Sequence, residues 1–295
     1  DVLGSRGLGD VYKRQINILY WNAGIRTEED RHSIRGENVR QKIIELILEN
    51  NIDIVILAEY TFDMKLMCDM LSVNGKDFKT APVPEDSRAK MLVSMKFNVE
   101  LIRDSKYYFI CSINNVLTDF LIAGLHFPSK RYAENRDREI VAEQFMDALC
   151  EAQSEAEHKK VIIAGDFNAD PFEEVMLKAN YFHALPYADI VENKRERDVY
   201  GKNYQMFYNP MWNFFGDLNT PHSTCYYDSG GAFNFYKHIF DQVIVSADMV
   251  KYFDKDNLKI VAETSSGVLA DGKGIPNRKE YSDHLPIVFG IKEDA

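Results

Sequence analysis

The chain has 295 residues, of which 45% are hydrophobic, and a formal net charge of −11 at pH 7. This composition can build the core of one large α/β domain and excludes a disordered chain, and no apolar run approaches the roughly 18 residues of a membrane helix. The negative charge argues against a protein that wraps nucleic acid by bulk electrostatics, although a local basic groove is compatible with it.

The first fifteen residues differ from the rest of the chain. Residues 1–15 lack apolar periodicity, and their last six, DVYKRQ, look like a translated transposon adapter of the kind used in sequencing libraries. We therefore predict a non-native tail over 1–15 and a single domain over 16–293. This prediction leaves two points open: whether the native N-terminus is missing from the chain, and whether it carried a signal peptide.

Two strands and two helices are predicted in the first quarter of the chain. They are a strand at 16–21, an amphipathic helix at 38–50, a strand at 53–58 that is apolar on both faces, and a helix at 62–71. Asn22 follows the first strand. Glu59 follows the second, where a carboxylate is either a strand-end acid or a site residue.

Three strands are expected next, at 91–94, 107–113 and 116–125, with Asn114 and Asn115 as a hairpin turn. His126 comes directly after the last of them, and a histidine there is either structural or catalytic. A long helix at 133–150 follows. The cations at its start are Lys130, Arg131, Arg136 and Arg138. They indicate a solvated helix start or, for Arg131 beside His126, contact with an anionic substrate.

The segment VIIAGDFNADP carries the strongest site signal. Residues 161–164 predict a short buried strand, after which Gly165 would allow a sharp turn. Asp166 and Asn168 would leave extended backbone on the same side, and Asp170 would cap a following helix. A carboxylate beside a carboxamide can take a proton, face a metal or donate to phosphate, although the segment could also be a solvated turn.

The last third of the chain holds an aromatic-rich insert and two more strands. The insert, at about 193–238, has no clear period, and its rings could pack the loop onto the core or stack on bases and sugars. Asp241 lies inside the strand 239–246, where a buried carboxylate needs a partner such as a histidine. Asp283 and His284 precede a final strand at 287–291.

Acids, amides and histidines thus recur at strand ends along the whole chain. They are Asn22, Glu59, His126, Asp166, Asn168, Asp241, Asp283 and His284. Open α/β architectures gather strand ends into one crevice, so we predict that these side chains form a single site.

Six motifs in this order resemble the endonuclease/exonuclease/phosphatase superfamily, the group around DNase I, AP endonucleases, inositol 5-phosphatases and neutral sphingomyelinases. The motifs are YWNAG, ILAEY, GLHFPSK, AGDFNADP, IFDQVIVS and YSDHLP. The resemblance implies an α/β fold of the DNase I-like type, a four-layer sandwich of two mixed β-sheets flanked by helices. The segment 203–240 matches none of the well-characterised branches and is similar to bacterial members whose substrates are unassigned.

The resemblance also implies a metal and its ligands. Glu59 would be the main Mg²⁺ ligand, with Asn22 beside it and Asp283 near the metal. Mg²⁺ prefers oxygen ligands and keeps several waters, so one or two carboxylates suffice, and Mn²⁺ is a possible substitute.

The remaining motif residues would be catalytic. Asp166 would activate or orient the attacking water, and Asn168 would steady Asp166 and touch the phosphate. His284, held by Asp241, would contact the phosphate or act as acid or base. The fifth catalytic residue, His126, would stabilise developing charge. Which residue is the general base stays open at this point.

We therefore expect a Mg²⁺-dependent phosphodiester hydrolase, in the first place a nuclease on DNA or RNA. The alternatives are an enzyme for a small phosphoester, such as a nucleotide, sugar phosphate or lipid head group, and a non-catalytic scaffold. Arg131 and Arg88 are candidate substrate contacts, with Lys90 and Lys130 beside them. The four cysteines are far apart and predict reduced, mostly buried thiols, so we expect a cytoplasmic protein, a monomer by default, without a membrane span.

Overall fold

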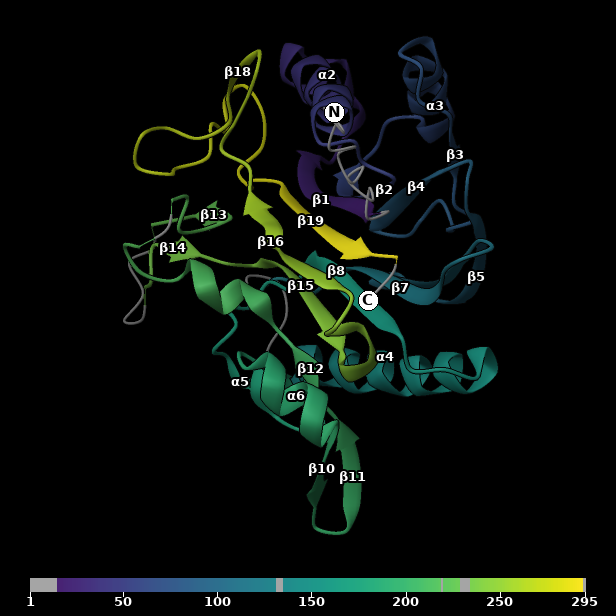
Figure 1. Cartoon of the computed structure of the whole chain (residues 1–295). Coiled ribbons are helices and arrows are strands. Elements are labelled where there is room, and N and C mark those ends of the chain that lie inside the picture. Colours follow the sequence, from purple (N-terminus) through teal and green to yellow (C-terminus); the bar gives the residue numbers. More distant parts are fainter. Residues whose placement is uncertain (1–14, 131–134, 219, 229–233, 294–295) are drawn as a thin grey trace, which may run out of the picture.

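A computed structural model describes residues 15–130, 135–218, 220–228 and 234–293. Two large mixed β-sheets form its centre (Figure 1). The first has the order β16 (Phe253–Ile260), β19 (Ile287–Lys292), β1 (Gln15–Ile25), β2 (Ile54–Tyr60), β4 (Ala89–Ser94) and β3 (Phe78–Thr80). The second has the order β5 (Asn98–Asp104), β6 (Tyr108–Asn114), β7 (Asp119–His126), β8 (Val161–Asp166), β15 (Asp241–Ser246), β12 (Phe207–Tyr208) and β9 (Ala184–Leu185).

Helices cover the outer faces of the two sheets. The main ones are α2 (Ile34–Glu49) and α3 (Met64–Val73) on the first sheet and α4 (Asn135–Ala156) on the second (Figure 1). Strand β8 explains the layering, because Ile162 and Ala164 join the core between the sheets while Val161 and Ile163 join the core under α4. The predicted four-layer α/β sandwich is therefore confirmed.

Several shorter elements complete the described chain. They are α1 (Glu28–His32), α5 (Glu174–Leu177), α6 (Ala188–Lys194), the 3₁₀ helices at Pro210–Phe214 and Ala247–Met249, and the strands β10 (Glu196–Val199), β11 (Lys202–Gln205), β13 (Cys225–Tyr226), β14 (Lys237–His238), β17 (Glu263–Thr264) and β18 (Gly267–Val268). Strands β5 and β16 were not expected from the sequence. Both are outer strands of their sheets with charged, partly exposed side chains, so they lack the apolar pattern of the central strands.

Two predicted boundaries need correction. The first residue of β1 is Gln15, which pairs with Lys292, although the sequence placed it in the tail; residues 1–14 lie outside the described chain. The hairpin between β6 and β7 turns over residues 115–118, and the side chain of Asn115 accepts hydrogen bonds from the amides of Leu117 and Thr118. The extent of the single domain, 16–293, stays a prediction.

The aromatic insert is more regular than its sequence suggests. Strand β12 pairs with β15 and so belongs to the second large sheet, while β10 and β11 form a hairpin that projects from it (Figure 1). Phe172, Phe215 and Phe235 lie in mutual contact, with ring centroids 5.3 to 5.9 Å apart. These rings pack the insert, whereas Tyr200 at the tip of the hairpin is fully exposed.

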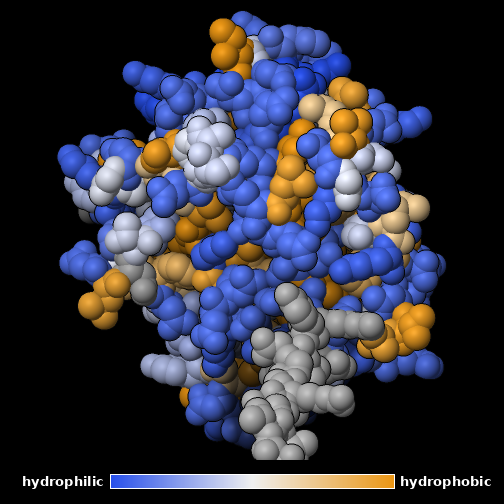
Figure 2. All heavy atoms as spheres, turned by 45° about the horizontal axis from the view of Figure 1, so that its top comes forward, coloured by the Kyte–Doolittle hydropathy of each residue, from blue (hydrophilic) through white to orange (hydrophobic). Residues whose placement is uncertain are grey.

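The sequence also made predictions about the surface and the cysteines. No helix within the described residues combines the length and apolarity needed to cross a membrane. On the face drawn in Figure 2, hydrophilic side chains predominate and hydrophobic ones lie in separate patches. None of the four cysteines is in a disulfide; Cys111 and Cys225 are buried as expected, Cys68 is half-buried and Cys150 is exposed.

One buried cluster ties the β17–β18 hairpin to α2 and yields a stability prediction. The Lys42 ammonium, itself buried, donates to Glu45 (2.6 Å) and to Ser266 (2.7 Å). Although partial burial opposes it, hydrogen bonds from Lys42, Ser266 and Ser265 to its carboxylate hold the pKa of Glu45 well below its usual range. Glu45→Gln removes the charge and should lower the free energy of unfolding at pH 7 by about 1–3 kcal/mol.

The pH dependence of that difference is the check. A carboxylate with a depressed pKa stabilises the fold above its unfolded pKa of about 4.3, and this contribution is lost as the pH falls toward the folded value. Urea melts of wild type and Glu45→Gln should therefore converge at acidic pH, while the exposed control Glu29→Gln should match wild type throughout. A constant difference between pH 7 and pH 3 would contradict the proposed hydrogen-bonded charge.

Candidate active site

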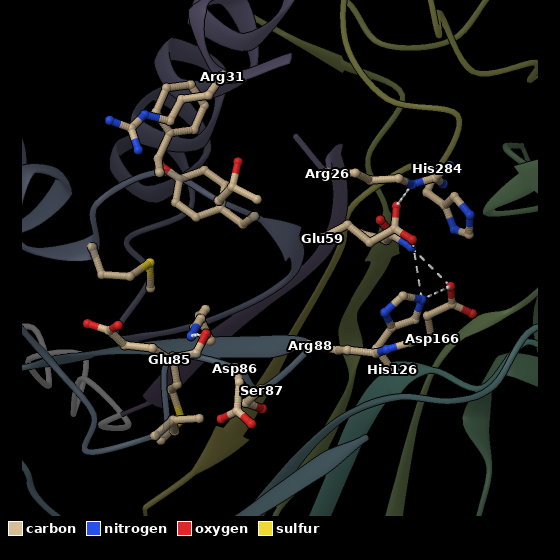
Figure 3. Close-up of a pocket in the computed structure, with 18 of the residues that line it drawn as sticks. Arg26, Arg31, Glu59, Glu85, Asp86, Ser87, Arg88, His126, Asp166 and His284 are labelled. Atoms are coloured by element: carbon tan, nitrogen blue, oxygen red, sulfur yellow. Dashed lines mark hydrogen bonds and ion pairs between the residues drawn. The ribbon is translucent and has the colours of Figure 1, made fainter. Parts of the chain in front are cut away.

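Ends of strands from both sheets converge on one cavity of about 1670 Å³. In the second sheet, His126, Asp166 and Asp241 lie opposite one another on neighbouring strands, because β7 pairs His126 with Asp166 and β15 pairs Asp241 with Asp166. From the first sheet, β1 contributes Asn22 and β2 contributes Glu59. Figure 3 shows Glu59, His126 and Asp166 linked side by side at one end of this cavity.

Asp166 is the most enclosed carboxylate that lines the cavity, with 1% of its surface exposed. Its Oδ2 accepts from Asn22 Nδ2 (3.0 Å) and its Oδ1 from the backbone amide of Asn168 (2.8 Å). Burial raises the pKa of Asp166, whereas the neighbouring His284 lowers it. The carboxylate is therefore fixed by two donors and kept away from bulk water, as a group that positions or deprotonates water requires.

Asn168 steadies Asp166 differently from the sequence prediction. Its backbone is in the left-handed region (φ 47°), so the expected extended geometry is wrong, and its side-chain Nδ2 donates to the carbonyl of Phe127 (2.9 Å). Gly165 does not make the turn. It lies within β8, and a Cβ there would be 2.3 Å from the Leu125 carbonyl oxygen, so the glycine allows neighbouring strands to approach.

Arg138 of α4 contacts the turn that contains Asn168. The side chain is 3% exposed, and its Nη2 donates to the carbonyl of Asn168 (2.8 Å). The sequence interpretation of Arg138 as part of a solvated helix start is therefore wrong. Because helix periodicity says nothing about a partner 30 positions away, no signal in the sequence distinguished Arg138 from Arg136, which is exposed.

His284 and Asp241 form the partnership that the sequence predicted for the buried acid. The ring Nδ1 of His284 lies 2.8 Å from Asp241 Oδ2, and Trp21 Nε1 donates to the His284 carbonyl (2.8 Å). Although burial opposes it, the Asp241 carboxylate raises the pKa of His284 well above its usual value. The imidazole is thus held in one orientation, and its protonated form is favoured.

The pKa of His126 is shifted in the opposite direction from that of His284. Its Nε2 lies 3.5 Å from Glu59 Oε1 and 3.8 Å from Asp166 Oδ2, and its Nδ1 has no hydrogen-bond partner among the described residues. Burial lowers the pKa of His126 to about 4, so the ring is neutral at pH 7. The pKa shifts of the two histidines in the cavity are therefore opposite in direction.

Glu59, Asn22 and Asp283 carry oxygen atoms that could hold a hard cation. Glu59 has a left-handed backbone (φ 47°) and pairs with Arg26, which the sequence did not single out and which also lies 4.0 Å from Asp283. The Arg26 guanidinium thus occupies the space between the two carboxylates. Carboxylate and amide oxygens around a cationic position fit Mg²⁺.

A second set of metal-ligating atoms lies deeper. One ligand atom from each of Asp166, Asp241 and His284 falls within 4.8 Å of the others, and all three residues are buried. The set could hold a divalent ion. The Nδ1 of His284 is engaged by Asp241, so Nε2 is the ring nitrogen that could bind such an ion.

The structure gives two further side chains near the site surroundings that the sequence did not predict. Asp170 does not cap a helix: its carboxylate binds His238 Nδ1 (2.7 Å) and the amide of Ile239 (2.8 Å), while α5 begins after Glu173. Tyr20, which the sequence did not single out, is buried next to the acids. Burial, with Asp241 next in importance, raises the pKa of Tyr20.

The structure describes three of the four side chains that the sequence predicted as substrate contacts. Arg88 lines the cavity and its guanidinium stacks on Tyr107, with 5.0 Å to the ring centroid. Arg131 lies outside the described residues. Lys130 lines the cavity and pairs with Glu173 (2.5 Å), and Lys90 donates to the carbonyl of Pro84 (2.9 Å).

Solved structures share this architecture. Caenorhabditis elegans TDP2 has 18% identity and a TM-score of 0.56 over 94% of this chain and 98% of its own. D. rerio TDP2 complexed with single strand DNA product has 14% identity and a TM-score of 0.54 over 94% and 99%. An endonuclease/exonuclease/phosphatase family protein from Bacteroides thetaiotaomicron has 15% identity and a TM-score of 0.53 over 96% and 99%.

Sequence comparison adds no relative. No protein-family model matches the chain, and no curated protein matches it. The structural likeness, which covers nearly the whole of the chains compared, stands beside the motif order found in the sequence. The chain therefore has the DNase I-like fold of the endonuclease/exonuclease/phosphatase proteins.

Proposed function

We propose that this protein is a divalent-metal-dependent hydrolase of phosphodiester bonds, and in the first place a nuclease on DNA or RNA. The observation that carries the proposal is the arrangement around Asp166. A buried, doubly hydrogen-bonded carboxylate shares one cavity with the neutral His126 and with His284, whose protonated form Asp241 favours. In-line hydrolysis of a phosphate ester needs a positioned water and donors near the developing negative charge, and these groups provide both.

Each residue has a role that follows from its surroundings. Asp166, held by Asn22 and by the Asn168 amide, would orient the attacking water and accept its proton. His284 would donate to the phosphate or to the leaving oxygen, because Asp241 favours its protonated form. The neutral His126 would donate a hydrogen bond to a phosphate oxygen.

A divalent cation, Mg²⁺ or Mn²⁺, would be held by Glu59 with Asn22 and Asp283 and would neutralise charge on the phosphate. Arg26 would have to leave its present position between the two carboxylates. Because half of the Arg26 side chain is exposed, this displacement costs little packing.

Single-stranded nucleic acid is the first substrate to test. A structure with the same fold, D. rerio TDP2, is complexed with single strand DNA product. The net charge of −11 disfavours a long duplex footprint. A small phosphoester is the second candidate, because the acids Asp63, Glu85 and Asp86 line the cavity together with its cations.

The test is hydrolysis of labelled single-stranded DNA, double-stranded DNA, RNA and bis(p-nitrophenyl) phosphate in parallel. We expect cleavage that requires Mg²⁺ or Mn²⁺, that EDTA abolishes and that added metal restores. Cleavage of the small diester without cleavage of any polymer would move the assignment to small phosphoesters. Absence of hydrolysis for all four substrates with either metal would refute the proposed function.

A further inference from the structure

The aromatic insert, residues 193–238, reaches the catalytic residues through one buried side chain. Thr224 directly precedes β13, and none of its surface is exposed to solvent. The hydrolysis proposed above gives Thr224 no role. Its hydrogen bonds nevertheless lead to the backbone on both sides of the Asp241–His284 pair.

Thr224 contacts the backbone beside each member of that pair. Its Oγ1 accepts a hydrogen bond from the amide of Asp241 (3.1 Å), and its carbonyl accepts one from the amide of Leu285 (2.7 Å), the residue after His284. The next residue continues this connection, since Cys225 forms an isolated β-bridge with His284. The 2.8 Å contact between Asp241 Oδ2 and His284 Nδ1 therefore depends on backbones that Thr224 holds together.

A second buried group, the carboxylate of Asp170, holds the segment that leads to Asp241. Asp170 is 1% exposed; its Oδ2 lies 2.7 Å from His238 Nδ1, and its Oδ1 accepts from the amide of Ile239 (2.8 Å). The amide of Thr224 in turn donates to the carbonyl of His238 (2.9 Å). Both anchors thus act on the few residues that precede Asp241.

Asp241 depends on such anchors because it is the first residue of β15. Strand β8 pairs with it through Asp166, but the residues directly before it belong to neither of the two large sheets. Segments at the ends of elements open locally unless further contacts hold them. Catalytic groups, however, must stay within about 0.5 Å of their productive positions. The anchors therefore act where the strand ladder alone is weakest.

We propose that Thr224 and Asp170 are positioning residues for the Asp241–His284 pair, so that the insert is a part of the catalytic machinery. This inference rests on the proposed function, since it concerns how His284 is held during hydrolysis. Thr224 and Asp170 are buried and do not belong to the described lining of the cavity, so neither touches substrate. They act through the backbone at Asp241 and at Leu285.

Thr224→Val tests the hydroxyl with little change in side-chain size. Valine keeps the backbone hydrogen bonds of position 224 but removes the acceptor for the Asp241 amide. It should lower kcat about 10- to 100-fold, as expected when a catalytic group is displaced by up to about 1 Å, with KM nearly unchanged. Thr224→Ser, which keeps the oxygen, should restore the wild-type kcat.

The dependence on the leaving group links this loss to His284. Two diesters are compared, one with a p-nitrophenolate and one with an alkoxide leaving group. Thr224→Val should show the same ratio of losses for the two diesters as His284→Gln does, because it disturbs the same group. A different ratio would overturn the assignment.

Ser246→Ala is the matched control at the other end of β15. Ser246 is fully buried, and its Oγ accepts a hydrogen bond from the amide of Val161 (2.9 Å). Thr224→Val and Ser246→Ala each leave a buried strand amide without its acceptor, so both should lower Tm. Only Thr224→Val should lower kcat. Equal losses of kcat in the two variants would reduce Thr224 to a structural role.

A double-mutant cycle examines whether the effect passes through His284. In the His284→Gln background, Thr224→Val should cause no further loss of kcat, because the group that it positions is already absent. Asp170→Asn keeps an acceptor for the Ile239 amide but loses the charge that faces His238, so its loss should be smaller and should also vanish in that background. Additive losses would overturn the proposal, and a wild-type kcat for Asp170→Asn would remove Asp170 from it.

A measurement without substrate separates this inference from the proposed function. Long-range ¹H–¹⁵N NMR reports on the ring nitrogens of the seven histidines, and His284→Gln identifies the signals of His284. Thr224→Val should shift these signals, whereas Ser246→Ala should leave them in place. Unchanged His284 signals in Thr224→Val would overturn the positioning role. Absence of hydrolysis by the wild-type protein would instead refute the proposed function, and the NMR result would still decide whether Thr224 positions His284.

Discussion

Asp166→Asn is expected to lower kcat for phosphodiester hydrolysis by about 10²- to 10⁴-fold, the usual contribution of a positioned general base. The substitution keeps the size of the side chain but removes the charge that orients a water and accepts its proton. One amide oxygen can still accept a hydrogen bond from Asn22 or from the Asn168 backbone, so the local structure should persist. Single-turnover rates at saturating substrate would measure the loss in the chemical step.

Stability measurements complete that test. Burial raises the pKa of Asp166, so keeping this carboxylate ionised costs stability in the folded protein. A neutral amide removes this cost, so Tm should be nearly unchanged or higher. Asp189→Asn, at an exposed position, is the matched control. A variant at position 166 that hydrolyses at the wild-type rate would remove this carboxylate from the mechanism.

His284→Gln should produce the second large effect, and its size should depend on the leaving group. If His284 donates a proton to the leaving oxygen, the loss should approach about 10²- to 10⁴-fold for a poor leaving group such as an alkoxide. It should be much smaller for p-nitrophenolate, which leaves without protonation. Comparing methyl p-nitrophenyl phosphate with a dinucleotide measures this difference.

Asp241 gives this prediction a structural basis. The 2.8 Å contact between Asp241 Oδ2 and His284 Nδ1 fixes the ring, so Asp241→Asn should reproduce part of the loss seen with His284→Gln. His32→Gln, a change on an exposed helix, serves as the control. Equal losses for both leaving groups would contradict proton donation and would instead indicate that His284 binds the phosphate.

The residue types at the strand ends were readable in the sequence because each follows a local pattern. A run of apolar residues predicts a buried strand, and a polar residue at its end must be either solvated or functional. This logic placed Asp166 and His126 at strand ends, where they pair, and it predicted a histidine partner for Asp241, which the His284 contact confirms. The same logic failed for β5 and β16, whose outer positions and charged side chains carry no apolar signal.

Local patterns misled where a distant partner decides the role of a residue. Asp170 has the type and position of a helix cap, yet it binds His238, 68 positions away. Arg138 stands near a helix start among other cations, yet it is buried against the carbonyl of Asn168. In both cases the sequence shows which charged group is present, but the tertiary structure determines which residue that group contacts.

By itself, the sequence determined the central strands of the two sheets, the order of the motifs along the chain and the types of side chain at the strand ends. These depend on periodicity and on residue chemistry, which act over a few positions. Only the tertiary structure decided that His126, Asp166 and Asp241 face one another and that Arg26 lies between Glu59 and Asp283. Such relations depend on strand register and sheet packing, which join residues far apart in the chain and leave no local trace in it.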